Sequence, residues 1–218
     1  GKPAVDGEND VAVLPIGVPE PFPGGRWVQQ YFLDVIDFAD PVNPTQREPV
    51  NSPGALIGLG RNGALVYTKA PHWDDDTLLS DGMEWLDVSA YDGVSLSLIY
   101  SLSLSFTWPH PTLVDSDVVY LGLPATRGRL RQGERRRSNN TLTTYRLADT
   151  GNFESLSEIA LPFPVSELRA ENDLLLAKVG QELWFYGLET SGALAPLGTG
   201  SQSNCFGLNL QAADGSVE

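Results

Sequence analysis

The sequence predicts an all-β fold, a β-propeller of about four blades with four antiparallel strands in each. Two observations carry this prediction: a similar turn recurs four times along the chain, and an apolar strand follows the turn at a nearly constant distance. Repeats of about this length are typical of propellers, in which every unit supplies one small sheet. The composition agrees, because 22 Gly and 16 Pro among 218 residues supply abundant turn material.

Each of the four turns closes a short run of apolar residues. The runs are rich in Tyr, Trp, Phe, Val and Leu, and they stop at Asp, Gly or Pro. That combination fits a strand on a pleated, half-buried surface that ends in a tight turn. The four turns are DFADP, SAYDG, LADTG and LETSG, at residues 37–41, 89–93, 147–151 and 188–192.

A second apolar strand follows each of the first three turns after 22 to 24 residues, and two further candidate strands, such as 95–102 and 111–116, fill the interval. A matching segment opens the chain. Blade units are therefore expected to start near residues 10, 64, 117 and 173, in steps of 54, 53 and 56 residues. We name the strands of a blade a, b, c and d in chain order. The recurring apolar strand is b, and the strand before each turn is c.

The connection from strand b to strand c varies most in length among the blades. It is expected at 17–26, 71–82, 124–140 and 180–181. Because all b–c connections of a propeller share one face, these insertions decorate a single surface. Insertions confined to one face are typical of a binding face, so function is expected there.

Residues 1–218 are expected to form a single propeller domain or a segment of one. The chain is expected to start at an a–b turn, and 205–211 have the pattern of another strand a. Two closures are open. This last strand completes the first blade and closes a four-bladed ring, or the chain belongs to a ring of six to eight blades. The larger ring is favoured, and its remaining blades then come from a partner or from the uncut polypeptide, since exposed edge strands invite pairing.

The first complete blade resembles a repeat of bacterial secreted and surface β-propeller proteins, which are distantly similar to WD40 propellers. In that repeat a strand ends in DVSDPxNPxxV and leads into a Gly-x-x-hydrophobic strand. The residues that carry the likeness, within 31–68, are Asp37, Asp40, Pro41, Asn43 and Pro44. The later blades keep Asp or Gly at the turn and lose the Pro-Asn-Pro element. The resemblance implies a propeller that mediates contacts, in an extracellular, periplasmic or cell-surface location.

Charge and hydropathy exclude some classes of function. The net charge of −14 disfavours nucleic-acid binding. No apolar run approaches the ~18 residues that a membrane-spanning helix needs, so no membrane span is expected. Gly1 opens the sequence with no signal segment after it, which indicates a mature, cleaved or trimmed form. Cys205 is the single cysteine and is expected to be a buried strand residue.

The acidic connection at 72–85 is the first candidate site. Its proposed binding residues are His72, Trp73, Asp74, Asp75, Asp76 and Trp85, and its further carboxylates are Asp81 and Glu84. Carboxylates beside aromatic planes can hold and cleave a sugar, so a carbohydrate-active enzyme of the glycoside hydrolase type is one alternative. Consecutive aspartates on a turn can also bind calcium, which makes Asp74, Asp75 and Asp76 the metal candidates. No other cofactor is expected, and a solvated acidic loop is the plain alternative.

The basic connection at 124–140 is the second candidate site. Its arginines are Arg127, Arg129, Arg131, Arg135, Arg136 and Arg137. Such a block is ordinarily a solvated, mobile loop. The functional alternatives are docking to an acidic partner and a processing site at 135–137. Because the two loops are successive b–c connections, we expect them to be neighbours that pair or form a dipolar patch.

Nucleophilic catalysis has little support in the sequence. His72 and His110 are the two histidines, His110 lies in a rigid Pro-His-Pro segment, and no G-x-S-x-G elbow is present. The favoured function is therefore a non-enzymatic interaction module that binds a protein or glycan through its b–c face. Two alternatives stay open: the carbohydrate-active enzyme, and a structural segment of a larger surface assembly.

Overall fold

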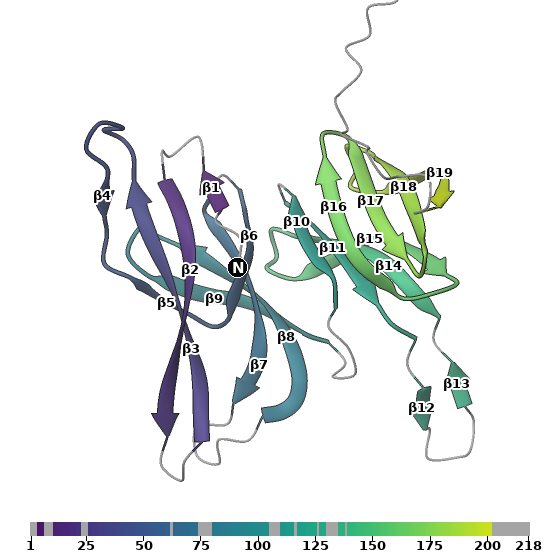
Figure 1. The fold of residues 1–218 in the computed structure, drawn as a ribbon, viewed down its shortest axis with the longest axis horizontal. Helices are drawn as coiled ribbons and strands as arrows, with labels where there is room; N and C mark the ends of the chain where they lie inside the picture. The colour runs from purple at the N-terminus through teal and green to yellow at the C-terminus, as the bar shows by residue number, and fades with distance from the viewer. Residues whose placement is uncertain are drawn as a thin grey trace, which may run out of the picture.

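A computed structural model of the chain describes residues 4–6, 11–22, 26–61, 63–73, 80–104, 110–115, 117–125, 127–129, 135–137 and 139–201. Within these ranges every regular element is a β-strand. Four antiparallel sheets of four or five strands are arranged like propeller blades, and one two-stranded hairpin is separate from them (Figure 1). The predicted all-β propeller class is thus confirmed. No helix in the described ranges is long and apolar enough to cross a membrane.

Each sheet follows the a–b–c–d order of a blade. The first sheet contains β1 (Ala4–Asp6), β2 (Val11–Phe22), β3 (Arg26–Asp37), β4 (Thr45–Gln46) and β5 (Val50–Ser52), with both β4 and β5 paired to β3. The second contains β6 (Ala55–Gly60), β7 (Leu65–Trp73), β8 (Ser80–Tyr91) and β9 (Leu96–Leu104). The third contains β10 (Thr112–Asp115), β11 (Val118–Leu123), β14 (Asn140–Leu147) and β15 (Phe153–Leu161). The fourth contains β16 (Val165–Glu171), β17 (Leu174–Val179), β18 (Glu182–Leu188) and β19 (Leu194–Ser201).

The b strands begin at Val11, Leu65, Val118 and Leu174, each one residue after the position expected for its blade unit. The start of the chain differs from the expectation. β1 pairs with β2 and is strand a of the first sheet, so the chain does not open at an a–b turn. The segment 205–211, expected as another strand a, lies outside the described residues.

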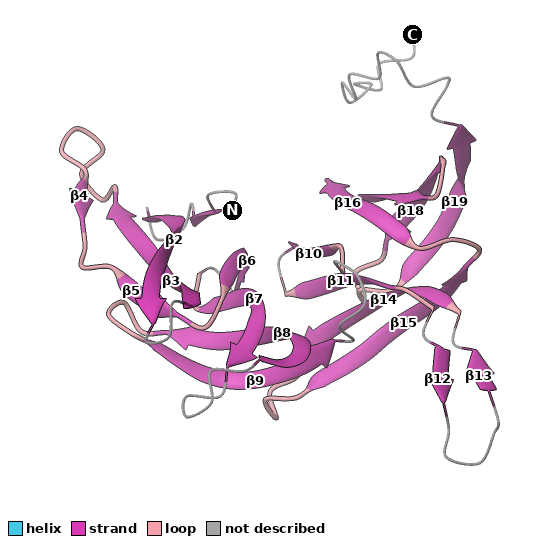
Figure 2. Ribbon diagram, turned by 60° about the horizontal axis from the view of Figure 1, so that its bottom comes forward, coloured by secondary structure: helices cyan, strands magenta, loops and turns pink. Residues whose placement is uncertain are grey.

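The four sheets follow an arc in chain order, with the first and fourth sheets at its two ends (Figure 2). Three apolar cores hold them together, one between each pair of successive sheets. The first and fourth sheets stand apart in Figures 1 and 2, so the described strands do not close a four-bladed ring.

Strand alternation gives every sheet two distinct faces. We call the face toward the next sheet in the chain the forward face and the opposite one the backward face. In β7, Leu65 and Tyr67 belong to the core shared with the third sheet, whereas Val66 belongs to the core shared with the first. Neighbouring side chains of a strand point to opposite faces, so this assignment extends along each b strand and to its partners in strand c.

Two strand glycines let successive sheets approach closely. A Cβ on Gly58 in β6 would lie 2.7 Å from Cβ of Val114 in β10, and a Cβ on Gly122 in β11 would lie 2.7 Å from Cβ of Val165 in β16. Only a residue without a side chain fits at these distances. A glycine packed against a valine of the next sheet therefore occurs both between the second and third sheets and between the third and fourth.

The b–c connections contain more strand than expected. In the first sheet β2 ends only at Phe22 and β3 already begins at Arg26. In the second sheet β7 ends only at Trp73 and β8 already begins at Ser80. Within the basic segment, β12 (Arg127–Arg129) and β13 (Arg135–Arg137) pair as an antiparallel hairpin. The strands of a blade alternate in direction. The end of strand b, the start of strand c and the connection from strand d to the next strand a therefore all lie at the same edge of the blade. We call this edge the b–c rim.

Candidate functional site

The b–c rim of the second sheet carries two clusters of polar side chains. Lys69 pairs with Leu86 across β7 and β8, while Thr68 pairs with Asp87 and Ala70 with Trp85. Lys69 therefore lies on the forward face, and Trp85 and Asp87 lie on the backward face. The two clusters are separated by the sheet itself.

The backward cluster is centred on Asp87, whose side chain is 0% exposed. One carboxylate oxygen, Oδ2, lies 2.9 Å from Nε2 of His72, and the other, Oδ1, accepts a 2.6 Å hydrogen bond from the hydroxyl of Ser101 in β9. The His72 ring stacks on Trp85 with centroids 4.6 Å apart and planes 2° from parallel. The side chain of His72 is 36% exposed, so the ring is fixed on two sides and open to solvent on another.

The strand geometry explains how these residues meet. The register of β7 with β8 shifts between Pro71 and Trp73, so a bulge lies at His72. Regular alternation places His72 on the backward face with Thr68 and Ala70, which is the face of Trp85 and Asp87. The bulge changes how far His72 lies along that face from its two partners.

The forward cluster joins the second sheet to the segment that leads into the third. Glu84 Oε2 lies 2.9 Å from Nδ1 of His110, whose side chain is 0% exposed. Lys69 Nζ lies 3.4 Å from Glu84 Oε1 and donates a 2.7 Å hydrogen bond to the backbone carbonyl of His110. The hydroxyl of Thr112 donates to the same carbonyl at 2.8 Å. This cluster connects the second and third sheets, and its charged groups contact one another and the carbonyl of His110.

The charge of Glu84 is set by these neighbours. Burial raises its pKa, but the hydrogen bond from His110 and the positive charge of Lys69 outweigh burial, so the pKa lies below its ordinary value of 4.5. Glu84 is therefore an anion at neutral pH, and its partners hold it in that state.

The two clusters suit different tasks. A buried carboxylate that accepts a hydrogen bond from one ring N–H of an imidazole fixes its tautomer and orientation, which leaves the other nitrogen to accept a proton from a reactant. Asp87 and His72 have this arrangement, and His72 is reachable from solvent. The carboxylate of Glu84 is occupied by Lys69 and His110, so this residue has a structural role.

The structure brings together two of the residues proposed from the sequence, His72 and Trp85. Trp73 ends β7, and its side chain lies outside the described part, as does that of Asp81. Asp74, Asp75, Asp76 and Arg131 lie outside the described residues. The other five arginines lie on the β12–β13 hairpin, where Arg127 pairs with Arg137, Gly128 with Arg136 and Arg129 with Arg135, and only their backbone is described.

The calcium prediction concerns residues that the structure does not describe. Among the side chains that it does describe, no group of three or more His, Cys, Asp or Glu residues is placed to hold a metal ion. Cys205 also lies outside the described residues. The proximity of the acidic and basic connections stays a prediction, because the charged side chains that would form the patch are not described.

Sequence reasoning missed Asp87, Ser101, Lys69 and the contact of Glu84 with His110. Asp87 stands in an ordinary strand pattern, and its polar partners come from the two neighbouring strands of its sheet. One signal was present: an Asp at a position that alternation assigns to a buried face requires partners. The contact between Glu84 and His110 had no signal, since it depends on how two sheets pack.

No protein-family model and no curated protein matches the sequence. Distant similarity is found to solved structures. A protein of Bacteroides fragilis NCTC 9343 described as a candidate 6-phosphogluconolactonase is 11% identical, with a TM-score of 0.46 over 92% of this chain and 58% of its own. The periplasmic gluconolactonase of Pseudomonas aeruginosa is 9% identical, with a TM-score of 0.36 over 91% and 84%. A protein from Lactobacillus plantarum is 13% identical, with a TM-score of 0.35 over 87% and 67%.

These comparisons correct the functional expectation. Both neighbours whose names state an activity are named as lactonases, and none of the three is described as an interaction module. The prediction of a non-enzymatic interaction module is therefore wrong, and the enzyme alternative is the better supported. The chain spans 58% of the length of the first of these structures.

Proposed function

We propose that the protein is a carbohydrate-active hydrolase with its reacting site at the b–c rim of the second sheet. His72 is the general base, and Asp87 orients it. The observation that carries this proposal is the 2.9 Å contact between Nε2 of His72 and Oδ2 of Asp87, in which the carboxylate is fully buried and the imidazole is open to solvent. Trp85 stacks on the imidazole and restricts its rotation.

The geometry favours an acyl carbon, as in a sugar lactone or ester, over a glycosidic bond. Glycoside hydrolysis ordinarily needs two carboxyl groups that flank one bond. Among the described carboxylates at this rim, Glu84 and Asp87 lie on opposite faces of the second sheet and cannot flank a common substrate. An imidazole base is instead suited to activate water for attack on a carbonyl.

In the proposed reaction one proton moves from water to His72 and then from His72 to the leaving oxygen of the ester. With Nε2–H donating to Asp87, Nδ1 of His72 accepts a proton from water as the water oxygen bonds to the carbonyl carbon. When the tetrahedral adduct breaks its bond to the ester oxygen, the imidazolium returns the proton to that oxygen. The products are a carboxylic acid and a free hydroxyl, and Asp87 stabilises the transient positive charge on His72.

The experiment measures hydrolysis by the full chain with a pH-stat, with the uncatalysed rate subtracted. The panel contains glucono-δ-lactone, an acetylated sugar and p-nitrophenyl glycosides. Glucono-δ-lactone is close to the substrate class named for two of the structural neighbours. We expect His72→Gln to lower kcat by about 10²- to 10⁴-fold, the ordinary contribution of a general base. Glu154→Gln on β15, an exposed residue of another sheet, is the control.

Two outcomes decide against the proposal. Equal activity of His72→Gln and the unsubstituted chain removes His72 from the reaction. Activity on glycosides alone, with none on lactone or ester, contradicts the acyl assignment. Asp87→Asn is expected to reduce kcat with a smaller effect on KM, because it changes the tautomer of His72 rather than the contacts with the substrate.

We further propose that the protein acts outside the cytoplasm, in the periplasm or at the cell surface of a bacterium, on a glycan-derived molecule. The resemblance of residues 31–68 to secreted propeller repeats supports this location, and one structural neighbour is periplasmic. Fractionation of cells that express the full-length protein tests it. Recovery in the cytoplasmic fraction alone would contradict the proposed location.

A further inference from the structure

Among the described residues, Asp87 is the only Asp or Glu whose whole side chain is buried. A charged group removed from water is costly unless hydrogen bonds and an opposite charge compensate it. An ionised carboxylate can accept about four hydrogen bonds, and each donor also restricts how the group can turn. The donors around Asp87 therefore decide how its carboxylate is oriented.

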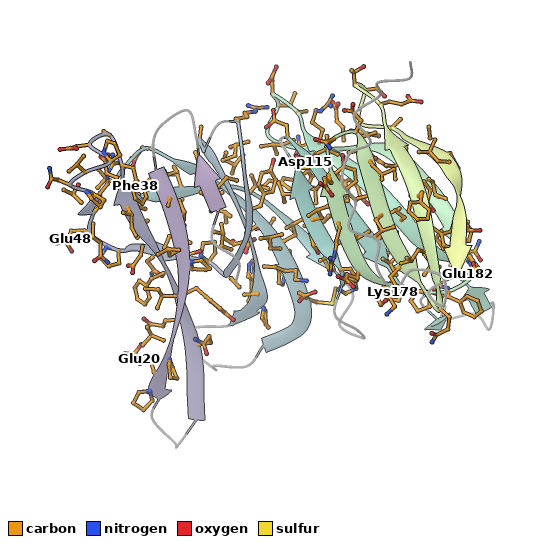
Figure 3. The ribbon with its side chains drawn as sticks, turned by 45° about the horizontal axis from the view of Figure 1, so that its top comes forward. Glu20, Phe38, Glu48, Asp115, Lys178 and Glu182 are labelled. Carbon is orange, nitrogen blue, oxygen red and sulfur yellow. The ribbon has the colours of Figure 1, made fainter. Side chains whose placement is uncertain are left out.

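The two partners of Asp87 come from opposite sides. β8, which carries Asp87, lies between β7 and β9 in the second sheet. Side chains project from both faces of the sheets (Figure 3), and strand pairing places Thr68, Asp87 and Ser101 in one row on the backward face. His72 of β7 contacts Oδ2, whereas Ser101 of β9 donates to Oδ1. Each carboxylate oxygen thus has its own partner, one from each neighbouring strand.

The hydrogen bond from Ser101 has the length of a charge-assisted bond. Its two oxygens are 2.6 Å apart, and hydroxyl-to-carboxylate bonds of this kind are about 2.5–2.7 Å long. Such bonds are stronger than bonds between neutral groups. Rotation of the carboxylate about the Cβ–Cγ bond of Asp87 would break it. Ser101 therefore restrains the plane of the carboxylate, and with it the position of Oδ2.

The other buried hydroxyls on this face do not take that role. Thr68 is the cross-strand partner of Asp87 in β7 and is fully buried, yet its hydroxyl has no hydrogen-bond partner among the described residues. Ser89, two residues further along β8, is buried in the same way without a described partner. Asp87 therefore depends on Ser101 for the hydrogen bond to Oδ1.

The position of Oδ2 matters because it orients His72. In the proposed reaction the imidazole takes a proton from water, and Asp87 stabilises the cation that forms. The hydrogen bond from Nε2–H to Oδ2 has to stay aligned while the imidazole changes its charge. A misplacement of about 1 Å can lower the rate of such a step by about 10²-fold.

We infer that Ser101 is a positioning residue of the hydrolase. It holds the carboxylate of Asp87 so that Oδ2 keeps the imidazole of His72 in line for proton transfer, and it acts through these two residues rather than on the substrate. The inference rests on the proposed function of His72. A serine that only satisfied a buried polar group would change stability and leave kcat unaltered, whereas a positioning serine lowers kcat and leaves KM unaltered.

The first experiment measures kcat and KM of the full chain on glucono-δ-lactone. We expect Ser101→Ala to lower kcat about tenfold with KM unchanged. Ser157→Ala is the matched control, because Ser157 also lies on a strand d, β15, and its hydroxyl shares a 2.9 Å hydrogen bond with that of Thr144. This control loses a similar hydrogen bond in another sheet, so both constants should stay as they are. Urea unfolding verifies that both variants fold.

Ser101→Thr separates the effect of the hydroxyl from that of the altered packing. It keeps a hydroxyl on the same carbon, and threonine suits a strand. We expect its kcat to lie within about threefold of that of the unsubstituted chain. The inference is overturned by equal kcat in Ser101→Ala and Ser157→Ala, by a raised KM at unchanged kcat, or by a Ser101→Thr variant as slow as Ser101→Ala.

A second experiment observes His72 itself and needs no substrate. Nitrogen-edited NMR of the full chain detects the proton on Nε2, and the signal is assigned by its loss in His72→Gln. We expect this proton to exchange with solvent at least about tenfold faster in Ser101→Ala, because its acceptor is no longer held in place. Unchanged exchange overturns the inference. A chain that hydrolyses none of the tested substrates contradicts the proposed function, and the exchange rate still decides whether Ser101 positions His72.

Discussion

Lys69 and His110 join the second and third sheets through a side-chain-to-backbone hydrogen bond of 2.7 Å from Nζ to the carbonyl oxygen. The same ammonium group lies 3.4 Å from Glu84, which also contacts the ring of His110. A charged donor thus serves two acceptors, and the segment before β10 is fixed to the rim of the preceding sheet. This connection makes sheet docking sensitive to the charge of Glu84.

Glu84→Gln is therefore expected to lose stability at neutral pH and to show little loss in acid. The pKa of Glu84 is lowered in the folded state, so its contribution is present above its ordinary pKa of 4.5 and is lost as pH falls through the folded pKa. At neutral pH the loss should be about 1.5–3 kcal/mol, the usual range for hydrogen bonds to charged groups. Urea unfolding at a series of pH values measures it. A difference that grows on acidification would contradict the assignment.

The contributions of Asp87 and Ser101 to the free energy of unfolding are expected to be coupled, because the two side chains share a hydrogen bond. Ser101→Ala should cost about 1 kcal/mol of unfolding free energy, because it removes one neutral donor. Asp87→Ala should cost more, about 1.5–3 kcal/mol, since it removes the charged acceptor of both His72 and Ser101. The double variant should fall short of the sum, and a double-mutant cycle by urea unfolding measures the coupling. Strict additivity would show that the two side chains do not interact.

Close packing of the third and fourth sheets at Gly122 is tested by Gly122→Ala. Its new Cβ would lie 2.7 Å from Cβ of Val165, so the sheets must separate, at a cost of about 1–3 kcal/mol. Gly200→Ala in β19 is the matched control, because its Cβ meets its nearest neighbour, Cε2 of Phe185, at an ordinary 3.5 Å. Thermal unfolding of both variants measures the difference. Equal stability of the two would contradict the close approach.

The fold was predictable because the evidence for it is local and repeated. The spacing of the four c–d turns and the run of apolar residues after Leu65 and Val118 depend on strand propensity and turn chemistry within single blades. The basic segment was less predictable. Cross-strand pairing of Arg127 with Arg137 places like charges opposite each other, which ordinarily disfavours a strand pair.

The candidate site was only partly predictable, since its contacts depend on register. Residues 72–85 were identified from their composition, and His72 and Trp85 are indeed in contact. Asp87 lies on the same face of the sheet, because alternation along β7 and β8 places it there with His72 and Trp85. Pro71 marks an irregular position in β7, but it does not fix the size of the register shift, so the contact between His72 and Asp87 could not be inferred from the sequence.

Tyr67 provides a test of the core between the second and third sheets. Its side chain is fully buried, and no described group is hydrogen-bonded to its hydroxyl. Burial, with a smaller contribution from the negative charge of Asp117, raises the pKa of Tyr67 to about 12 from an ordinary value of 10.0. The folded state therefore favours the neutral phenol. Its stability relative to the unfolded chain should fall as pH rises from 10 through the folded pKa.

Tyr67→Phe removes this titration and an unsatisfied buried hydroxyl while it keeps the ring. At neutral pH we expect the variant to be as stable as the unsubstituted chain or more stable by about 1 kcal/mol, because the desolvation penalty of the hydroxyl disappears. Its advantage should widen above pH 10, by up to roughly 1.4 kcal/mol for each unit by which the pKa is raised. Urea unfolding near neutral pH and in alkaline buffer measures both effects. A variant that is less stable at neutral pH would show that the hydroxyl has a hydrogen-bond partner in the folded protein.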